Sequence, residues 1–196
     1  MIRLLFLTYL TMINAHTKCS PTNSPSHSPS HINTIPPTNS PTHSKGSCIH
    51  GSGMLTLYSG ENRHISNMSL GMVIKTADRF NTFSFNEIIS IPHAHNNDST
   101  TFITILTDAH KQLILTPTHL IPKCDHSDVT AAELYIGDCL FTVDGKESIV
   151  DIYTSVKNGV YTVVTNNTYI IVNDVIVSPF SINNYLISKL IISKNK

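Results

Sequence analysis

Short apolar runs separated by polar turns recur from residue 48 to about residue 179, and this pattern constrains the fold most. Each run has the length of a strand, and the runs follow one another closely. Val, Ile and Thr, whose branched side chains favour strands, are prominent in them. The pattern predicts an all-β domain, with strands at 54–58, 72–75, 87–91, 101–106, 112–115, 139–143, 148–153, 160–165 and 169–173.

Three dipeptides predict tight turns between these strands. Asp144-Gly145 and Asn158-Gly159 are typical of β-hairpins. Asn166-Asn167 lies between two β-branched runs, at a place where Asn tolerates a positive φ. One helical turn is predicted within residues 129–135, ahead of Gly137.

The chain before residue 48 has a different character. Residues 1–15 carry one charge, Arg3, a mainly apolar run and a small residue at Ala15, which is typical of a secretory signal peptide. The run is too short to span a bilayer. Residues 16–47 are rich in Ser, Pro, Thr and His and cannot bury enough apolar surface to offset the entropy of ordering. We therefore predict a secreted chain with a disordered, mucin-like N-terminal segment and no transmembrane segment.

Composition limits the partners and cofactors that we expect. Charged residues make up 13 % of the chain and the formal net charge is zero, so the sequence lacks the excess of positive charge that is typical of nucleic-acid-binding proteins. The histidines of residues 16–47 could bind a metal weakly, but a polar repeat without a ligand is the favoured interpretation. We expect that the protein binds no metal and no cofactor and that it is a monomer. Residues 180–196 have apolar side chains at roughly helical spacing, which predicts a short amphipathic tail. Packing on the domain and contact with a membrane surface remain alternatives for that tail.

The chain has four cysteines, Cys19, Cys48, Cys124 and Cys139. In the oxidising surroundings of a secreted protein an even count allows two disulfides. If Cys48 keeps a free thiol, Cys124–Cys139 is the only pair wholly inside the β domain. The sequence leaves the pairing open.

Cys48 stands where the low-complexity segment gives way to the β domain, and Thr116-Pro117-Thr118-His119 follows an apolar strand. A thiol at Cys48 can attack the carbonyl of Ser47 and convert the Ser47–Cys48 amide into a thioester. Because free Cys is mostly protonated near neutral pH, the step needs a base, or a strained and polarised amide, and a proton donor for the departing nitrogen. His119 suits that last task, and Thr116 can hydrogen-bond the same amide. Taken singly, each motif also fits a structural cysteine or an incidental histidine in a turn.

Residues 48–179 resemble the hedgehog-type Hint domain, the autoprocessing fold shared with inteins. The resemblance is carried by the opening Cys48-Ile-His-Gly-Ser-Gly-Met-Leu-Thr-Leu-Tyr-Ser-Gly60 and by the block Leu115-Thr-Pro-Thr-His-Leu-Ile121. Segments 65–71, 131–138, 159–161 and 169–178 are supportive. The resemblance implies a compact Hint-type β fold and an N-to-S acyl shift at the cleavage site Ser47–Cys48.

The resemblance also implies roles for individual residues. Cys48 is the expected nucleophile, Thr116 and His119 are expected to activate the scissile amide, and an outside nucleophile then releases the segment before Cys48. In hedgehog proteins that nucleophile is cholesterol, which becomes esterified to the released fragment. The family's Asp that activates the sterol aligns with His93, which is therefore a candidate base with His95 as an ambiguous neighbour. A surface loop with two incidental histidines is the alternative.

Three departures from the family pattern affect these expectations. Ser47 stands where the family has Gly, and Ser178-Pro179-Phe180 stands where many relatives have Ser-Cys-Tyr, so the second family cysteine is missing. The tail is short for a sterol-presenting module. We therefore expect water, a thiol or a small alcohol as the resolving nucleophile, ahead of a sterol.

The main hypothesis is a self-cleaving secreted precursor that performs one autocatalytic cleavage of its own peptide bond. A secreted mucin-like interaction protein with an inactive Hint fold is the alternative. A Cys/His protease acting on other proteins is disfavoured, because a nucleophile at the very start of a domain suits action on the chain's own bond.

Overall fold

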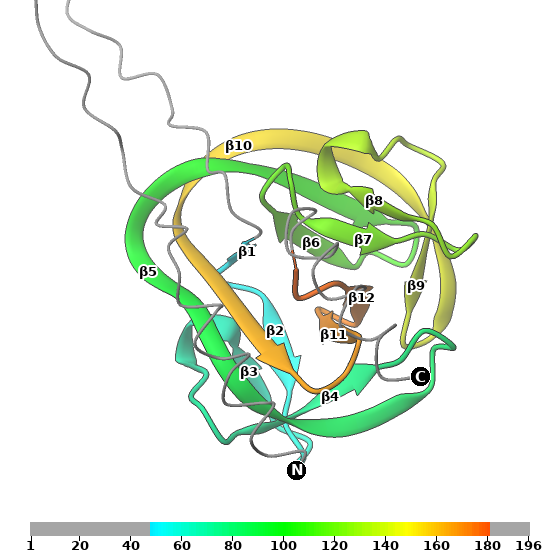
Figure 1. Cartoon of the computed structure of the whole chain (residues 1–196). Coiled ribbons are helices and arrows are strands. Elements are labelled where there is room, and N and C mark those ends of the chain that lie inside the picture. Colours follow the sequence, from blue (N-terminus) through cyan, green and yellow to red (C-terminus); the bar gives the residue numbers. More distant parts are fainter. Residues whose placement is uncertain (1–47, 181–196) are drawn as a thin grey trace, which may run out of the picture.

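The computed structural model describes residues 48–180, shown in Figure 1. The predicted signal peptide, the predicted disordered segment at 16–47 and the amphipathic tail beyond Phe180 lie outside the described residues. Among residues 48–180, no helix is long and apolar enough to cross a membrane.

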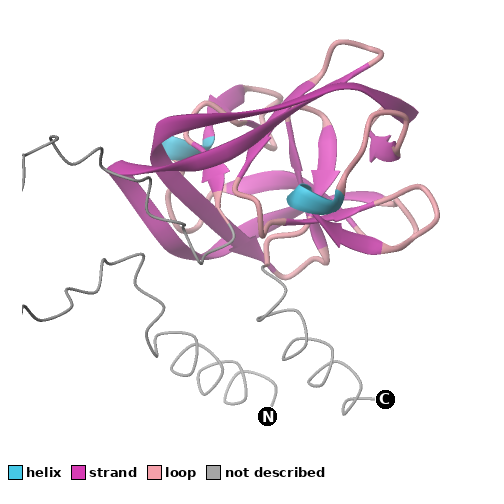
Figure 2. Ribbon diagram, turned by 90° about the horizontal axis from the view of Figure 1, so that it is seen from above, coloured by secondary structure: helices cyan, strands magenta, loops and turns pink. Residues whose placement is uncertain are grey.

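Strands make up most of the described chain, with two short 3₁₀ turns between them (Figure 2). The all-β prediction is therefore confirmed. The elements are β1 Ile49–His50, β2 Met54–Thr56, β3 Asn62–His64, η1 Ile65–Asn67, β4 Val73–Ala77, β5 Phe83–Thr107, β6 Gln112–Leu115, β7 Leu120–Pro122, β8 Asp128–Thr130, η2 Ala131–Glu133, β9 Cys139–Thr142, β10 Gly145–Thr165, β11 Tyr169–Val172 and β12 Val175–Val177.

Two long strands replace four of the predicted short ones. The runs at 87–91 and 101–106 both belong to β5, and the runs at 148–153 and 160–165 both belong to β10. The polar residues between the runs stay in the ladder because β5 and β10 pair with each other, so their backbone groups find partners without apolar side chains. Figure 1 shows the two strands bending together around the molecule.

The prediction of a hairpin turn at Asn158-Gly159 is wrong. Gly159 lies inside β10 with φ of +94°, and the pairing register with β5 shifts between Asn158 and Val160. A glycine at positive φ beside a register shift is typical of a β-bulge, which bends a strand without ending it. Asn and Gly are common both in β-bulges and in hairpin turns, so the Asn158-Gly159 dipeptide alone does not distinguish the two structures.

The turn at Asp144-Gly145 is confirmed, since Thr142 pairs with Gly145 across it. Asn166-Asn167 does lie in the connection from β10 to β11, but neither residue has the expected positive φ, which falls instead on Asn173 and Asp174 between β11 and β12. The predicted helical turn appears as η2, a 3₁₀ turn closed by a capping box between Thr130 and Glu133.

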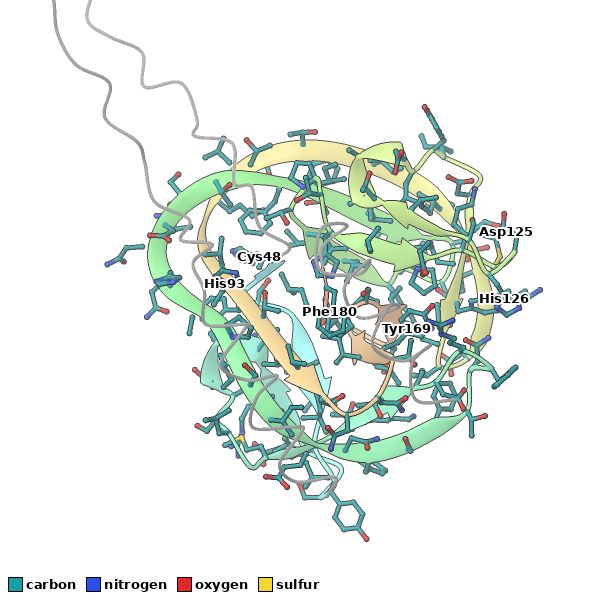
Figure 3. All side chains as sticks on the ribbon, viewed as in Figure 1. Cys48, His93, Asp125, His126, Tyr169 and Phe180 are labelled. Atoms are coloured by element: carbon teal, nitrogen blue, oxygen red, sulfur yellow. A yellow bond between two sulfur atoms is a disulfide. The ribbon has the colours of Figure 1, made fainter. Side chains whose placement is uncertain are left out.

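The largest sheet closes into a barrel with the strand order β1-β10-β9-β12-β11-β4-β5-β6. Ile49, Ile103, Leu115 and Tyr161 belong to its main apolar core. Cys48, labelled in Figure 3, precedes β1. It belongs instead to a small separate cluster of buried residues, with Phe102, Ile114 and Val160. Because neighbours in a strand point to opposite faces, Ile49 and Cys48 lie on opposite sides of the sheet.

A disulfide between Cys124 and Cys139, left open by the sequence, ties the β7–β8 connection to β9. The Cα atoms of the two cysteines are 5.3 Å apart, within the range that a disulfide needs. Cys48 is buried and forms no disulfide within residues 48–180. The covalent link holds the segment that follows His119 against the barrel.

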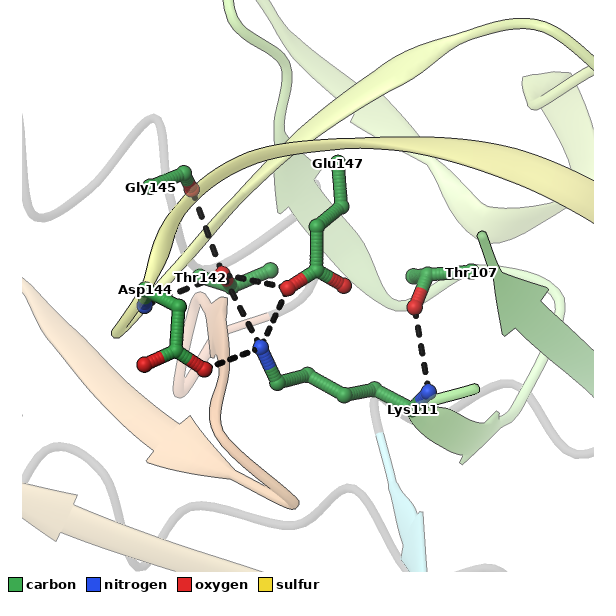
Figure 4. Close-up of polar contacts among 6 residues, drawn as sticks. All are labelled: Thr107, Lys111, Thr142, Asp144, Gly145 and Glu147. Atoms are coloured by element: carbon green, nitrogen blue, oxygen red, sulfur yellow. Dashed lines mark hydrogen bonds and ion pairs between the residues drawn. The ribbon is translucent and has the colours of Figure 1, made fainter. Parts of the chain in front are cut away.

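Lys111 forms an ionic cluster with a buried carboxylate, Glu147, and an exposed one, Asp144 (Figure 4). Its ammonium group contacts Glu147 and lies 2.7 Å from Oδ2 of Asp144. Burial would raise the pKa of Glu147, but the hydrogen bonds from Lys111 and from nearby threonine hydroxyls outweigh burial and lower it. The cluster fastens the start of β6 to the β9–β10 hairpin.

Replacing Lys111 by Met should leave the buried carboxylate of Glu147 without its cation. We expect the free energy of unfolding at pH 7 to fall by about 2–4 kcal/mol, because an unpaired buried charge is costly. The exposed Lys146 provides the matched control, and Lys146→Met should change that free energy by less than about 0.5 kcal/mol. Urea unfolding followed by circular dichroism measures both variants, and equal losses would contradict the role of the cluster.

Candidate functional site

The amide nitrogen of Cys48 is held by the side chain of Thr116. The Cys48 N–H donates to Oγ1 of Thr116 over 2.9 Å, and the Thr116 hydroxyl donates in turn to the Cys48 carbonyl oxygen over 3.3 Å. The backbone N–H of Thr116 donates to the same carbonyl over 2.9 Å. Since that nitrogen belongs to the Ser47–Cys48 peptide bond, Thr116 contacts the bond predicted to be cleaved; Ser47 itself lies outside the described residues.

The sequence Thr116-Pro117-Thr118-His119 forms the turn between β6 and β7. The His119 N–H donates to the carbonyl of Thr116 over 3.0 Å, which closes the turn. The prediction that Pro117 favours a turn over a helix is confirmed. β6 pairs with β1 through Leu115 and Ile49, so this turn begins beside Cys48.

The imidazole of His119 is completely buried and lies between the two ends of the described domain. Its Nε2 is 2.8 Å from the carbonyl oxygen of Ser178, and the ring also forms a hydrogen bond with the backbone of Cys48. Burial lowers the pKa of His119 to about 4, although both hydrogen bonds act to raise it. The ring is therefore neutral at pH 7.

Ser178 takes part in the site through its backbone, a contact that the sequence did not predict. It follows β12, and its N–H donates to the carbonyl of Leu120 over 3.2 Å, one residue beyond His119. Ser178, the first residue of the segment that replaces the Ser-Cys-Tyr of relatives, thus orients the His119 ring. This contact uses the backbone carbonyl of a residue 59 positions away, so no side-chain type in the sequence indicates it.

His93 lies in β5, not in a surface loop, and shares a face of the sheet with Cys48. His50 pairs with Val160, and continuing this register by two residues places Cys48 opposite Thr162, which pairs with His93. The row Cys48–Thr162–His93 spans two strand spacings, or about 10 Å. Figure 3 labels Cys48 and His93 in this part of the molecule.

The structure thus brings Cys48, Thr116 and His119 together and keeps His93 at a distance on the same face. Burial, then the neighbouring His95, lower the pKa of His93, while Asp98 raises it. Thr162, buried between Cys48 and His93, was missed by the sequence analysis. Only the pairing of β1 with β10 reveals it, and that pairing joins residues far apart in the chain. Within residues 48–180, no three His, Cys, Asp or Glu side chains gather as metal ligands.

Comparison with known proteins decides the family. The family model of the Hint module matches residues 36–193, which is most of the chain. The chain belongs to the Hint module family. The resemblance drawn from the Cys48 and Thr116–His119 blocks is therefore confirmed, and the domain is of the hedgehog/intein autoprocessing type.

Individual relatives agree with this assignment. The Indian hedgehog protein of Xenopus laevis is 26 % identical over 152 residues, which cover 70 % of this chain and 37 % of the frog protein. This chain therefore matches little more than a third of that relative. A DnaB intein from Synechocystis sp. PCC 6803 has a TM-score of 0.59 at 17 % identity, covering 69 % of this chain and 99 % of the intein. A bacterial intein-like domain from Clostridium thermocellum has a TM-score of 0.56 at 16 % identity, covering 67 % and 97 %. The solved structures support the Hint-type fold.

The low pKa of His119 predicts how stability depends on pH. Between about pH 6.5 and pH 4 the unfolded histidine binds a proton that the folded one does not, so stability falls as pH falls through this window. From pH 7.5 to pH 4.5 this histidine should cost about 2–3 kcal/mol of unfolding free energy, at about 1.4 kcal/mol per pKa unit.

A comparison of variants isolates that contribution. The loss of stability between the two pH values, measured by urea unfolding, should be smaller by that amount in His119→Asn than in the original chain. His110→Asn is the control, since His110 is exposed and sits at φ of +64°, which Asn tolerates. An NMR titration of the His119 ring with a midpoint near 6.5 would refute the prediction.

Proposed function

We propose that this protein cleaves its own chain at Ser47–Cys48 through a thioester on Cys48. The observation that carries the proposal is the hydrogen bond from the Cys48 N–H to Thr116, because it engages the nitrogen that must leave. Membership of the Hint module family, which includes autoprocessing domains, supports the same reaction. The buried thiol of Cys48, which forms no disulfide within the described residues, supplies the nucleophile.

In the first step, Sγ of Cys48 attacks the carbonyl carbon of Ser47, the carbon–nitrogen bond breaks, and the nitrogen of Cys48 leaves as an amine. We assign the proton transfer to His119, whose neutral ring accepts the thiol proton and then donates it to the departing nitrogen. The pKa of about 4 supports the second of these transfers, the donation to the nitrogen, because a ring with a low pKa gives up its proton readily.

Thr116 would assist at the nitrogen. A hydroxyl accepts and donates hydrogen bonds, so Oγ1 can accept the amide N–H before the reaction and donate to the nitrogen lone pair as amide resonance is lost. Its 2.9 Å separation from the nitrogen supports this role. The further bond to the Cys48 carbonyl keeps the hydroxyl in position.

Resolution of the thioester would release the segment before Cys48. Water, a thiol or a small alcohol is the proposed nucleophile, with a sterol as the weaker choice. Cys48 and His93 lie on one face of the sheet, two strand spacings apart with Thr162 between them, and this arrangement supports His93 as the base that accepts the proton of an attacking alcohol. We further propose that the precursor is secreted, on the support of its similarity to a hedgehog protein and of the apolar N-terminal run.

An interaction protein with an inactive Hint fold is the second candidate. It is favoured by Ser47, which is bulkier than the Gly found at that position in the family, and by the missing family cysteine at Ser178-Pro179. In this case the β domain would present the N-terminal segment without releasing it.

Dithiothreitol separates the two candidates. In the full chain we expect the thiol to accelerate cleavage between Ser47 and Cys48, because thiols attack thioesters but not amides. Intact mass after incubation with and without the thiol measures the fragments. Cys48→Ala should abolish cleavage, and Thr116→Val should slow the thiol-induced reaction by about tenfold or more. An intact chain under both conditions would favour the interaction protein.

The role of His93 predicts a change confined to the second step. His93→Asn should slow transfer of the N-terminal segment to an added small alcohol by about tenfold or more, because the base that accepts the alcohol proton is gone. Cleavage by dithiothreitol should stay within about twofold of the original rate, since a thiol is largely self-sufficient as a nucleophile near its pKa. His95→Asn, on the same strand, is the matched control and should change neither rate.

A further inference from the structure

A second polar pair lies just beyond Cys48, in the turn that ends β1. Nδ1 of His50 is 2.7 Å from Oγ of Ser52, and the backbone N–H of Ser52 is directed at the same nitrogen over 3.3 Å. A backbone N–H can only donate, so Nδ1 is the accepting nitrogen of the ring. The Ser52 hydroxyl therefore donates its hydrogen to His50.

The other ring nitrogen of His50 is held by the backbone. The ring forms a hydrogen bond with the backbone of Asn158, and since Nδ1 accepts, Nε2 carries the hydrogen that reaches this carbonyl. Burial, and then the charge of Lys157, lower the pKa of His50, so the ring is neutral near pH 7. A neutral ring that is oriented on one side and accepts from a serine hydroxyl on the other is the arrangement that activates a nucleophilic serine.

Close packing fixes the turn that carries Ser52. A Cβ atom at Gly51 would lie 2.6 Å from Cε2 of Tyr161, and one at Gly53 would lie 2.8 Å from Cγ1 of Val172. The Gly53 N–H also donates to the His50 carbonyl over 2.9 Å. Because only glycine fits on either side of it, the serine is held at one place against the barrel.

The pair lies on the same side of the sheet as the Cys48 thiol. His50 is two residues after Cys48, so both side chains project from one face, about 7 Å apart along the strand. The His50 ring packs edge-on against Phe102, with ring centroids 5.3 Å apart, and Phe102 belongs to the buried cluster of Cys48. Ser52 is exposed in the turn that follows β1, and its hydroxyl is joined through the His50 ring to the face that carries this cluster.

We propose that Ser52, activated by His50, is an acyl acceptor built into the chain; this rests on the thioester proposed above. Oγ of Ser52 attacks the thioester carbonyl, its proton passes to Nδ1 of His50, and the carbon–sulfur bond breaks. The Cys48 thiolate then takes the proton from His50. The product is an ester between the Ser47 carboxyl and Ser52, which water hydrolyses with His50 again accepting the proton.

The same thioester is thus resolved by two different reactions. Hydrolysis passes through Ser52 and His50, whereas transfer to an outside hydroxyl takes place directly at Cys48 with His93 as the base. The two routes use different histidines on one face of the sheet, so single substitutions distinguish them.

The test compares two rates in the full chain, release of the N-terminal segment in water and cleavage by dithiothreitol. Ser52→Ala and His50→Gln should each slow release in water by about tenfold or more, while cleavage by dithiothreitol stays within about twofold of the original. Ser52→Thr, which keeps a hydroxyl, should retain more of the release than Ser52→Ala. Ser59→Ala, a change at another exposed turn serine, should alter neither rate.

The outcomes separate this inference from the proposed function. Release in water at the original rate by Ser52→Ala would overturn the acceptor role and leave the thioester mechanism standing. If Ser52→Ala slowed release in water and cleavage by dithiothreitol equally, the acceptor role would also be overturned. Such a result would show that Ser52 acts before the thioester is resolved, through a structural role. A full chain that dithiothreitol does not cleave would overturn the proposed function and this inference together.

Discussion

The antiparallel ladder between β5 and β10 is the constraint on which the other elements depend. It runs from the pair Ile149–Thr107 to the pair Thr165–Ile88, with register shifts that allow both strands to bend. The other strands of the barrel attach to these two directly or through a neighbour, and β1 lies between β10 and β6. The position of Cys48 is therefore set by strands whose residues lie far from it in sequence.

The register of β1 decides which side chain becomes the nucleophile. Ile49 faces the main core, and Cys48 and His50 face the opposite side. A slip by one residue would exchange the two faces, burying the thiol in the main core and moving the isoleucine to the site. The pairs of Ile49 with Tyr161 and with Leu115 fix the strand on both of its edges. Apolar burial on one side of β1 thus sets the chemistry on the other.

The fold class could be predicted because short β-branched runs are a local signal for strands, and Pro117 within Thr116-Pro117-Thr118-His119 is a local signal for a turn. The proximity of that turn to Cys48, 68 residues earlier than Thr116, was expected only from the family resemblance. The continuity of β5 and β10 could not be predicted, since polar residues such as His95 and Ser99 stay in the ladder only because a partner strand satisfies their backbone groups. The role of Ser178 was hidden for a similar reason, because its contact with His119 uses a backbone carbonyl.

The burial of His119 links the proposed reaction to the completion of folding. A neutral ring can be buried at modest cost when its polar atoms are paired, whereas a buried imidazolium would be expensive. One partner of His119 is the backbone of Cys48, at the start of the domain, and the other is the carbonyl of Ser178, after the last strand. The ring is therefore oriented only when both ends of the domain are in place. On the proposed mechanism, a chain that has not yet placed β12 lacks an oriented proton carrier, so cleavage at Cys48 follows folding and does not compete with it.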